Sequence, residues 1–240
     1  MGKLDLYNLV AESKQLSTPT THNSITKSDK SIMRDAIKLP AIADGMRIGL
    51  FGGSFNPPHA GHVHVSQTAL IKGKLDQVWW LVTPGNPLKD TSQLASLTQR
   101  LKKCHELIKH PKIKVSAIEA KYNLRYTQQT LALLKKLCPR INFVWIMGAD
   151  NLKNFHQWQN WREIANQMPI MIIDRPGSTL SYRSAQAAIA LSKYRIDETD
   201  AHLLANMKAP AWAFIHGPRN SLSSTAIRNK ISNNAKKHSN

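Results

Sequence analysis

The stretch from Met46 to Gly73 constrains the fold of this chain more than any other. Its first part, Met46 to Phe51, is short and largely apolar and runs into Gly52-Gly53, as a buried parallel strand that ends in a turn would. From Ala60 to Ile71 apolar residues recur at helical spacings, and Gly73 follows as a stop signal. A strand, a glycine turn and a helix in this order predict the first unit of a parallel α/β sheet.

The turn between this strand and this helix has the features of an anion site. Gly52 and Gly53 let the backbone approach a bulky ligand where a Cβ would clash. The start of the following helix offers unpaired N–H groups and the positive end of the helix dipole. His59 precedes the helix and His62 lies in its first turn, so both imidazoles are placed to donate to one anion. Phosphate is the anion that this geometry favours.

The sequence Gly-Gly-Ser-Phe-Asn-Pro-Pro-His-Ala-Gly-His at residues 52–62 resembles the signature of the nucleotidyltransferase superfamily. A lone histidine is more often structural, whereas two histidines three residues apart after a Gly-Gly turn form a much narrower pattern. Several acceptors share the signature, so it implies transfer of a nucleotidyl group and leaves the acceptor open. The resemblance implies ATP contacts from Gly52, Gly53, Ser54, His59 and His62.

The chain departs from the superfamily pattern at two places. Many members have Thr and Asp at the positions of Ser54 and Asn56. Ser54 keeps the hydroxyl, whereas Asn56 lacks the charge, so no mechanism relies on it as a base. The loop after the second strand also lacks the histidine that many members have before Lys89.

The rest of the chain alternates apolar strands with amphipathic helices. Further strands are expected at 77–82, 113–116, 142–148, 169–174 and 211–216, and helices at 97–109, 127–137, 184–192 and 224–231. In the helix at 127–137, Leu131, Leu134 and Leu137 are expected to face the core. Strands separated by helices predict an α/β fold with a doubly wound, Rossmann-like parallel sheet, as one catalytic domain over residues 46–232.

Residues of unusual chemistry follow the ends of the expected strands. The histidine loop follows the first, the loop 83–90 the second, Gly148-Ala149-Asp150 the strand at 142–148, and Arg175-Pro176-Gly177 the strand at 169–174. In doubly wound sheets, ligands bind beyond the carboxyl ends of the strands. The sequence therefore predicts a single active site at that edge of the sheet.

A second phosphate-binding helix start is predicted near the end of the chain. In Ser223-Ser224-Thr225-Ala226-Ile227-Arg228, hydroxyl residues precede an arginine by about one helical turn. Alone, this segment is equally typical of an ordinary helix cap. Together with the histidine motif it resembles the superfamily's second signature, which folds over the triphosphate. The resemblance implies that Ser224, Thr225 and Arg228 neutralise charge on the departing pyrophosphate.

Within the superfamily, two further segments resemble the nicotinate mononucleotide adenylyltransferases. Gly148-Ala149-Asp150-Asn151-Leu152 is followed, eight residues after the aspartate, by Trp158. The resemblance places Gly148 and Asp150 at the nucleotide and stacks Trp158 on the nicotinate ring; the alternative is a buried strand end before an aromatic packing helix. The segment 125–131 also resembles this family, with helix capping and support of the pyridine site as equal interpretations. The implied acceptor contacts are Thr83, Lys89, Tyr126, Thr127, Trp158 and Arg175.

The resemblance implies that the 5′-phosphate of nicotinate mononucleotide attacks the α-phosphorus of ATP and expels pyrophosphate, which gives nicotinate adenine dinucleotide, a precursor of NAD. A phosphate monoester has a second pKa of about 6 and is ionised at pH 7, so no general base is required. Catalysis then rests on alignment and charge neutralisation. The expected catalytic residues are His59, His62, Ser54 and Arg228, with Mg²⁺ held mainly by substrate oxygens and water and no dedicated protein metal site.

Two classes of alternative remain beside this one. Within the superfamily, the acceptor could be nicotinamide mononucleotide or phosphopantetheine. From another class, a nucleic-acid-binding module would explain the net charge of +18, although it would leave the signatures unexplained. The basic residues are scattered and no nucleic-acid-binding signature accompanies them, so no specific nucleic acid is expected as a partner. The oligomeric state stays open.

The two ends of the chain are expected to lie outside the folded domain. Residues 1–45 predict a poorly ordered leader, because 16–30 is rich in Ser, Thr, Asn and Lys, and the fold is expected to begin near Met46. Residues 233–240 form a polar tail. No run reaches the roughly 18 apolar residues of a membrane span, and no signal peptide is evident. Together with Cys104 and Cys138, which are interpreted as reduced thiols, this predicts a cytoplasmic protein with no membrane partner.

Overall fold

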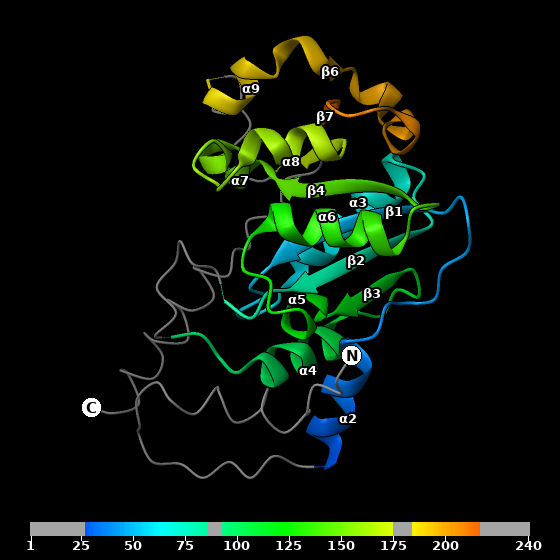
Figure 1. The fold of residues 1–240 in the computed structure, drawn as a ribbon, viewed down its shortest axis with the longest axis vertical. Coiled ribbons are helices and arrows are strands. Elements are labelled where there is room, and N and C mark those ends of the chain that lie inside the picture. The colour runs from blue at the N-terminus through cyan, green and yellow to red at the C-terminus, as the bar shows by residue number, and fades with distance from the viewer. Residues whose placement is uncertain (1–26, 86–92, 175–183, 217–240) are drawn as a thin grey trace.

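The computed structural model describes residues 27–85, 93–174 and 184–216 (Figure 1). Its centre is a sheet of seven strands in the order β3-β2-β1-β4-β5-β7-β6. Every pairing in this sheet is parallel, which confirms the expected doubly wound α/β fold. The strands are β1 (Arg47–Gly53), β2 (Gln77–Val82), β3 (Ile113–Ser116), β4 (Asn142–Gly148), β5 (Ile170–Ile173), β6 (Arg195–Ile196) and β7 (Trp212–Ile215).

Both faces of the sheet are covered, and the strand sequences show why. In β2, five of the six residues are buried. Successive side chains of a strand point to opposite faces. Trp79 and Leu81 accordingly join one hydrophobic cluster, whereas Val78, Trp80 and Val82 join another. Because both faces of this strand are buried, its sequence is a nearly continuous apolar run, as is typical of parallel strands in α/β proteins.

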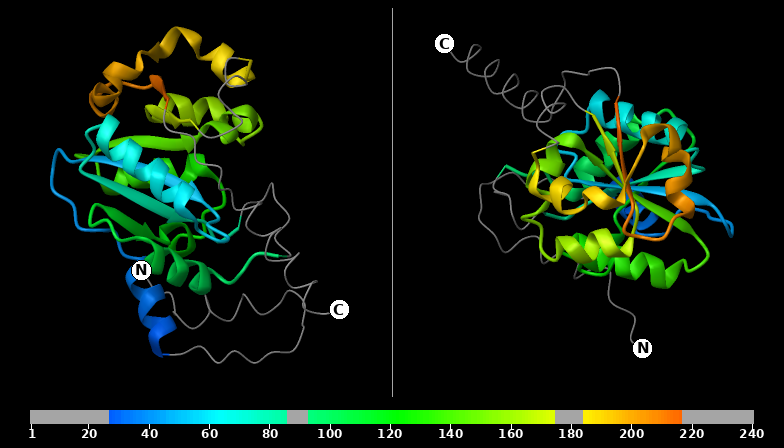
Figure 2. Two further views of the ribbon diagram at one scale, coloured as in Figure 1. Left: turned by 180° about the vertical axis from the view of Figure 1, so that it is seen from behind. Right: turned by 90° about the horizontal axis from the view of Figure 1, so that it is seen from above.

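The helices divide between the two faces of the sheet. One cluster contains core residues of α6, α7, α8 and α9, on the face seen in Figure 1. The other contains residues of α2, α3, α4 and η3, and Figure 2 shows α3 on this face from behind. The helices are α2 (Lys27–Ala36), α3 (Ala60–Lys72), α4 (Leu97–Leu107), α5 (Ile118–Lys121), α6 (Thr127–Leu137), α7 (Ala149–Phe155), α8 (Trp161–Gln167) and α9 (Gln186–Ala190), with 3₁₀ turns η2 (Ser192–Tyr194) and η3 (Glu198–Asn206).

Most expected elements are present with the bounds that the hydrophobic pattern predicts. The strands at 77–82, 113–116 and 142–148 and the helix at 127–137 match, and the other expected elements within the described residues differ by a few residues at their ends. The helix expected at 224–231 lies outside the described residues. One core assignment is wrong. Leu137 is 40% exposed, although Leu131 and Leu134 are fully buried. Cys138, seven residues after Leu131 and therefore on the same side of the helix, takes the inner position instead.

The expectation that the fold begins near Met46 is wrong, because described residues before Met46 pack on the core. Helix α2 packs Ala36 into the cluster on its face of the sheet, with Ile32, Met33 and Ile37 against it. The carbonyl of Ala36 accepts a hydrogen bond of 2.7 Å from the N–H of Ala117. Residues 1–26 and the tail at 233–240 lie outside the described residues. The packed part of the chain thus includes α2.

Two observations bear on the expected compartment, namely the state of the cysteines and the search for a membrane-spanning helix. Cys104 and Cys138 are free and buried, as expected of reduced thiols. None of the described helices combines the length and the hydropathy that a membrane-spanning helix needs.

Candidate active site

The carboxyl ends of the central strands meet at one edge of the sheet, where the sequence places the functional loops. In the register of β1 and β2, Gly53 lies opposite Val82. In the register of β4 and β5, Gly148 lies opposite Ile173. The loops that follow these strands therefore start side by side, and in Figure 1 the arrowheads of β1, β2 and β4 point to the same edge.

His59 and His62 form a reciprocal cap at the start of α3. The ring Nδ1 of His59 accepts a hydrogen bond from the N–H of Gly61, and that of His62 accepts one from the N–H of His59, each at 3.1 Å. The two rings lie 3.9 Å apart between centroids. Because Nδ1 is an acceptor in both, each neutral ring carries its proton on Nε2. The backbone N–H groups thus hold each ring in the tautomer whose Nε2–H can donate to a ligand.

The position of His62 is fixed by one aromatic side chain from the loop after β1 and one from strand β2. Its ring lies 4.8 Å from that of Phe55 and 5.8 Å from that of Trp80, and Phe55 stacks on Trp80 at 4.6 Å. The indole N–H of Trp80 donates to Ser66 Oγ at 2.7 Å, and the Ser66 hydroxyl donates to the carbonyl of His62 at 2.9 Å. Strand β2 thus holds the first turn of α3 through a side-chain relay.

Gly52 has a packing role as well as the expected one at the ligand. A Cβ at Gly52 would lie 2.6 Å from a ring carbon of Trp145, whereas one at Gly53 would lie 3.2 Å from the ring of Phe55. The space left by the missing side chain of Gly52 is thus taken by an indole ring of β4. Trp145 also contacts Trp158 edge to face, with 6.4 Å between ring centroids. One indole therefore links the glycine turn to the proposed stacking residue.

Trp158 lies three residues after the end of α7 and contacts Trp145 of β4. It packs edge to face on Phe155 at 5.4 Å and is partly buried. Gly148 is the N-cap of α7, and Asp150 lies in its first turn with an exposed side chain. An acidic residue in a first helical turn also stabilises the helix by itself. The structure thus brings Gly148, Asp150 and Trp158 to the edge where the histidines lie.

The segment that begins α6 supports its neighbours more than it caps its helix. Tyr126 is the N-cap, but its side chain makes no capping hydrogen bond. Thr130 instead donates to the buried carboxylate of Glu119 at 2.9 Å. Burial raises the pKa of Glu119, against the effect of hydrogen bonds from Thr130 and Thr83. Thr130 thus links α6 through Glu119 to Thr83, just after β2, while Tyr126 and Thr127 are both partly buried at the start of the same helix.

Two backbone donors that could select a carboxylate at the pyridine ring are already used. The N–H of Thr83 donates to the carbonyl of Gly53 at 3.1 Å, and the N–H of Trp158 donates to that of Phe155 at 3.0 Å. The hydroxyl of Thr83 has the carbonyl of Gly85, at 3.1 Å, as an alternative acceptor to the carboxylate of Glu119. Any contact between Thr83 and the acceptor in this arrangement therefore comes from its side chain.

Five expected site residues lie outside the described part of the chain, namely Lys89, Arg175, Ser224, Thr225 and Arg228. Three residues that the sequence does not predict as part of the site contact the segments after β1 and β2. They are Asn56, Arg100 and Glu119. Sequence signals existed for two of them. Arg100 precedes Cys104 by four residues and so lies on the buried side of its helix, and Glu119 interrupts an apolar run.

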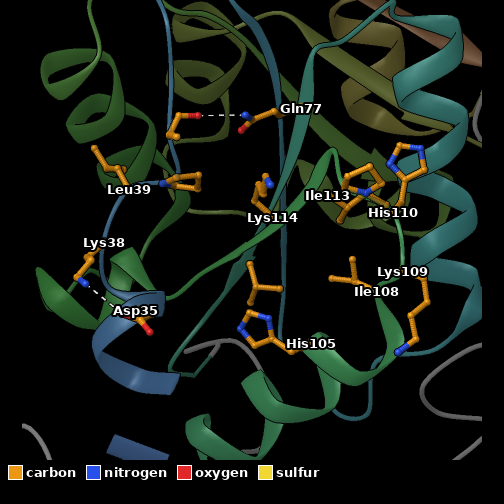
Figure 3. Close-up of a pocket in the computed structure, with 14 residues that line it drawn as sticks. Asp35, Lys38, Leu39, Gln77, His105, Ile108, Lys109, His110, Ile113 and Lys114 are labelled. Atoms are coloured by element: carbon orange, nitrogen blue, oxygen red, sulfur yellow. Dashed lines mark hydrogen bonds and ion pairs between the residues drawn. The ribbon is translucent and has the colours of Figure 1, made fainter. Parts of the chain in front are cut away.

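A cavity of about 560 Å³ lies at the opposite edge of the sheet (Figure 3). Gln77 and Ile113 are the first residues of β2 and β3, so this cavity lies at the amino ends of the strands. Its lining is basic and includes Lys38, Lys109, Lys114, His105 and His110, with Asp35 paired to Lys38 at 3.0 Å. Burial lowers the pKa of His105. The cavity is separate from the edge that carries the histidine pair.

Comparison with solved structures agrees with this fold. The structure of Plasmodium falciparum nicotinic acid mononucleotide adenylyltransferase complexed with NaAD has a TM-score of 0.58. That of the same protein complexed with APC has a TM-score of 0.57. Both are 20% identical in sequence, with 77% of this chain and 83% of that chain covered. At this identity the likeness shows the fold alone.

Comparison with sequences defines the family. A family model described as cytidylyltransferase-like matches residues 50–230. A protein of Agrobacterium fabrum named "Probable nicotinate-nucleotide adenylyltransferase" is 61% identical over 184 residues, 77% of this chain and 98% of that protein. Proteins of the same name from Mesorhizobium japonicum and Brucella suis are 58% and 60% identical, with 79% and 76% of this chain and 97% and 94% of those proteins covered. The chain therefore belongs to the cytidylyltransferase-like family and, within it, to the nicotinate-nucleotide adenylyltransferases.

Proposed function

We propose that this protein transfers the adenylyl group of ATP to nicotinate mononucleotide, producing nicotinate adenine dinucleotide and pyrophosphate for the biosynthesis of NAD. Relatives about 60% identical, which the chain covers almost completely, carry the name of this activity. The observation that carries the proposal is the reciprocal cap of His59 and His62 after the carboxyl end of β1, with Trp158 packed on Trp145 of the neighbouring β4.

The histidine pair supports binding of the triphosphate. Each Nδ1 accepts a backbone N–H at the start of α3, so each Nε2–H is a donor that needs no positive charge. A hydrogen bond from a backbone N–H polarises the imidazole and strengthens the bond that it donates in turn. Preorganised donors of this kind stabilise charge that develops on the phosphates, and losing one costs about a hundredfold or more in turnover.

The acceptor needs alignment more than activation. The 5′-phosphate of the mononucleotide is already ionised at pH 7 and attacks the α-phosphorus without a base. Trp158 is held by Trp145 and Phe155, so its indole offers a fixed face to a flat aromatic ring. Stacking of this kind contributes about 0.5–1.5 kcal/mol beyond burial. Ser54 lies near the reacting phosphates, and Ser224, Thr225 and Arg228 neutralise the pyrophosphate.

Mg²⁺ in this proposal is bound mainly by phosphate oxygens and water, and it neutralises charge on the triphosphate. The donor set supports this. Asp150 supplies the one carboxylate among the proposed nucleotide contacts, and the described residues contain no group of three or more His, Cys, Asp or Glu side chains that could hold a metal. Mg²⁺ commonly keeps several waters and binds through substrate phosphates. The proposed location of the protein is the cytoplasm.

Nicotinamide mononucleotide is the second candidate acceptor, because the face of Trp158 suits either pyridine ring. The test measures pyrophosphate release from Mg·ATP with nicotinate mononucleotide, nicotinamide mononucleotide or phosphopantetheine offered separately. We expect kcat/KM to be roughly ten- to a hundredfold higher for the nicotinate, the scale set by one mismatched polar contact of about 1–3 kcal/mol. Equal use of both pyridines, or preference for the amide, would reassign the acceptor. Binding of DNA without pyrophosphate release would contradict the enzyme assignment.

A further inference from the structure

The guanidinium of Arg100, near the start of α4, is the most deeply buried charge among the described residues, with 1% of the residue exposed. Its described hydrogen bonds all go to backbone carbonyls. Nε donates to Ala95 at 2.9 Å, Nη1 to both Ser54 and Thr83 at 2.7 Å, and Nη2 to Pro84 at 3.2 Å.

These carbonyls belong to two loops of the active site. Ser54 begins the histidine loop after β1, which we define as residues 54–59. Thr83 and Pro84 begin the acceptor loop after β2, which we define by its described residues 83–85 and 93–96. One planar group therefore holds the ends of two neighbouring strands at once. A guanidinium can do this because its donors point in fixed directions from a rigid plane.

Burial of this cation is costly, so its position needs an explanation. Loss of solvent lowers the pKa of Arg100 to about 10, which leaves it protonated at pH 7. An apolar side chain of similar size could fill the same volume without this penalty. The four bonds to the main chain therefore specify a geometry that hydrophobic packing alone would not.

Asn56 joins the same two loops from the other side. Its Nδ2 donates to the carbonyl of Gln93 at 3.0 Å, and its Oδ1 accepts from the N–H of Ala95 at 3.3 Å. Both functions of the amide are used, and a carboxylate could supply only one of them. A side chain of the histidine loop thus contacts the acceptor loop close to the point where Arg100 does.

We propose that Arg100 is a positioning residue that fixes the histidine loop relative to the acceptor loop, with Asn56 as its partner. The proposal rests on the proposed function, in which the triphosphate and the acceptor bind to different loops and must meet in line. A misplacement of about 1 Å between reacting groups can lower the rate about a hundredfold. Loss of Arg100 should therefore lower kcat far more than it weakens the binding of ATP alone.

A matched control exists at the opposite end of the same two strands. Arg47 begins β1, and its Nε and Nη2 pair with the carboxylate of Asp76, just before β2, at 3.3 and 3.2 Å. This pair also joins β1 to β2, but at the edge away from the histidines. Arg47→Met therefore removes a similar tie between strands without touching the active-site loops.

The experiment compares Arg100→Met, Arg100→Lys, Asn56→Asp, Arg47→Met and the double variant Asn56→Asp/Arg100→Met in the full-length protein. The measurements are the melting temperature, the Kd of Mg·ATP, and kcat and KM for nicotinate mononucleotide well below each melting temperature. Amide hydrogen exchange at residues 54–56, Thr83 and Gly85 reports on the loops independently of activity.

We expect Arg100→Met to lower kcat about 30- to 100-fold, with the Kd of ATP changed less than about threefold, a separation that loss of alignment predicts. Lysine should not rescue kcat, because one ammonium cannot span both loops. The double variant should lose less than the product of the two single losses. Arg47→Met should keep kcat within about twofold of the wild type, since it leaves both loops in place.

Three results would overturn the proposal: a kcat of Arg100→Met within threefold of the wild type, full rescue by lysine, or an equal loss in Arg47→Met. If Arg100→Met does not fold, Arg100→Lys carries the same test. A wild-type protein without activity on any mononucleotide contradicts the proposed function instead. In that case hydrogen exchange tests the positioning role of Arg100 independently of activity. Unchanged protection of both loops in the Arg100 variants would refute this role.

Discussion

The indole ring of Trp145 occupies the space in which a Cβ of Gly52 would lie, with only 2.6 Å between that position and the nearest ring carbon. Because the ring also contacts Trp158, a change at the glycine turn reaches the proposed acceptor site through a single rigid group.

Gly52→Ala is expected to displace Trp145 and to lower the free energy of unfolding by about 1–3 kcal/mol, the usual range for overpacking a core. It should also raise KM for the acceptor, because Trp158 loses its support. Thermal unfolding and steady-state kinetics check both effects. Gly53→Ala is the control, since its Cβ would meet Phe55 at 3.2 Å and needs a smaller shift. Equal destabilisation by both variants would contradict the role of Trp145.

His62→Ala is expected to lower turnover by about a hundredfold or more, through loss of one preorganised donor. It should also lower stability by about 1 kcal/mol, because Nδ1 of His62 caps a backbone N–H. His62→Asn separates the two roles, since Oδ1 can replace Nδ1 as the acceptor while no group replaces Nε2–H. Its melting temperature should recover without its turnover. Normal turnover in the asparagine variant would show that Nε2 makes no catalytic contact.

Trp158→Ala is expected to raise KM for either pyridine mononucleotide by roughly two- to tenfold or more, the scale of one stacking contact, with kcat less affected. The ratio between nicotinate and nicotinamide should stay nearly constant, because a ring face does not distinguish them. Trp161→Phe is the matched control: Trp161 is buried and also contacts Phe155, at 5.8 Å, so its loss should reduce stability and spare KM. The same change of KM in both variants would assign Trp158 to packing alone.

The stability of the protein is expected to contain a contribution from Glu119 that decreases as pH rises. Burial raises the pKa of this carboxyl above its ordinary value of 4.5, so above that pH the native state binds more protons here than the unfolded state. The contribution is complete below pH 4.5 and is lost as pH rises through the raised pKa. Glu119→Gln should remove this dependence in melting curves recorded between about pH 5 and 8. An unchanged pH profile would argue against the buried carboxyl.

Deleting residues 1–45 is expected to lower the melting temperature, because it removes α2 and its contact with the core through Ala36. Deleting residues 1–26 keeps α2 and serves as the control. A point variant, Ala36→Asp, tests the same contact by burying a charge where 3% of the residue is exposed. If both deletions melt with the wild type, α2 does not stabilise the domain.

The parts of the fold that follow from local pattern could be predicted from the sequence. Strand β2 and helix α6 are examples, because their bounds follow from runs and spacings of apolar side chains. The sequence allows a short helix at about 31–37, but the polar segment before it assigns these residues to a leader and not to the fold, although Ile32, Met33, Ala36 and Ile37 have helical spacing. The position of His59 and His62 at the start of α3 could be predicted because the glycine turn and the helix start are contiguous in sequence.

The contacts of Arg100 and Asn56 could not have been predicted in this way. Arg100 lies 46 residues from the carbonyl of Ser54, and Asn56 lies 37 residues from that of Gln93. Their partners are main-chain atoms, which every residue has, so no pairing of residue types marks them in the sequence. Only the register of β1 beside β2 brings these groups together.

That Arg100 binds carbonyl oxygens also bears on how such a site can change over generations. A carbonyl oxygen stays in place when the side chain of its residue is exchanged. A mutation at Thr83 or Pro84 can therefore change the side chains that the acceptor loop offers to a substrate while the hydrogen bonds from Arg100 persist. The side chains that set substrate preference can then change without any change in the residues that anchor the loop. A library that randomises the side chains of this loop, with Arg100 and Asn56 kept, could therefore explore new acceptors on an unaltered frame.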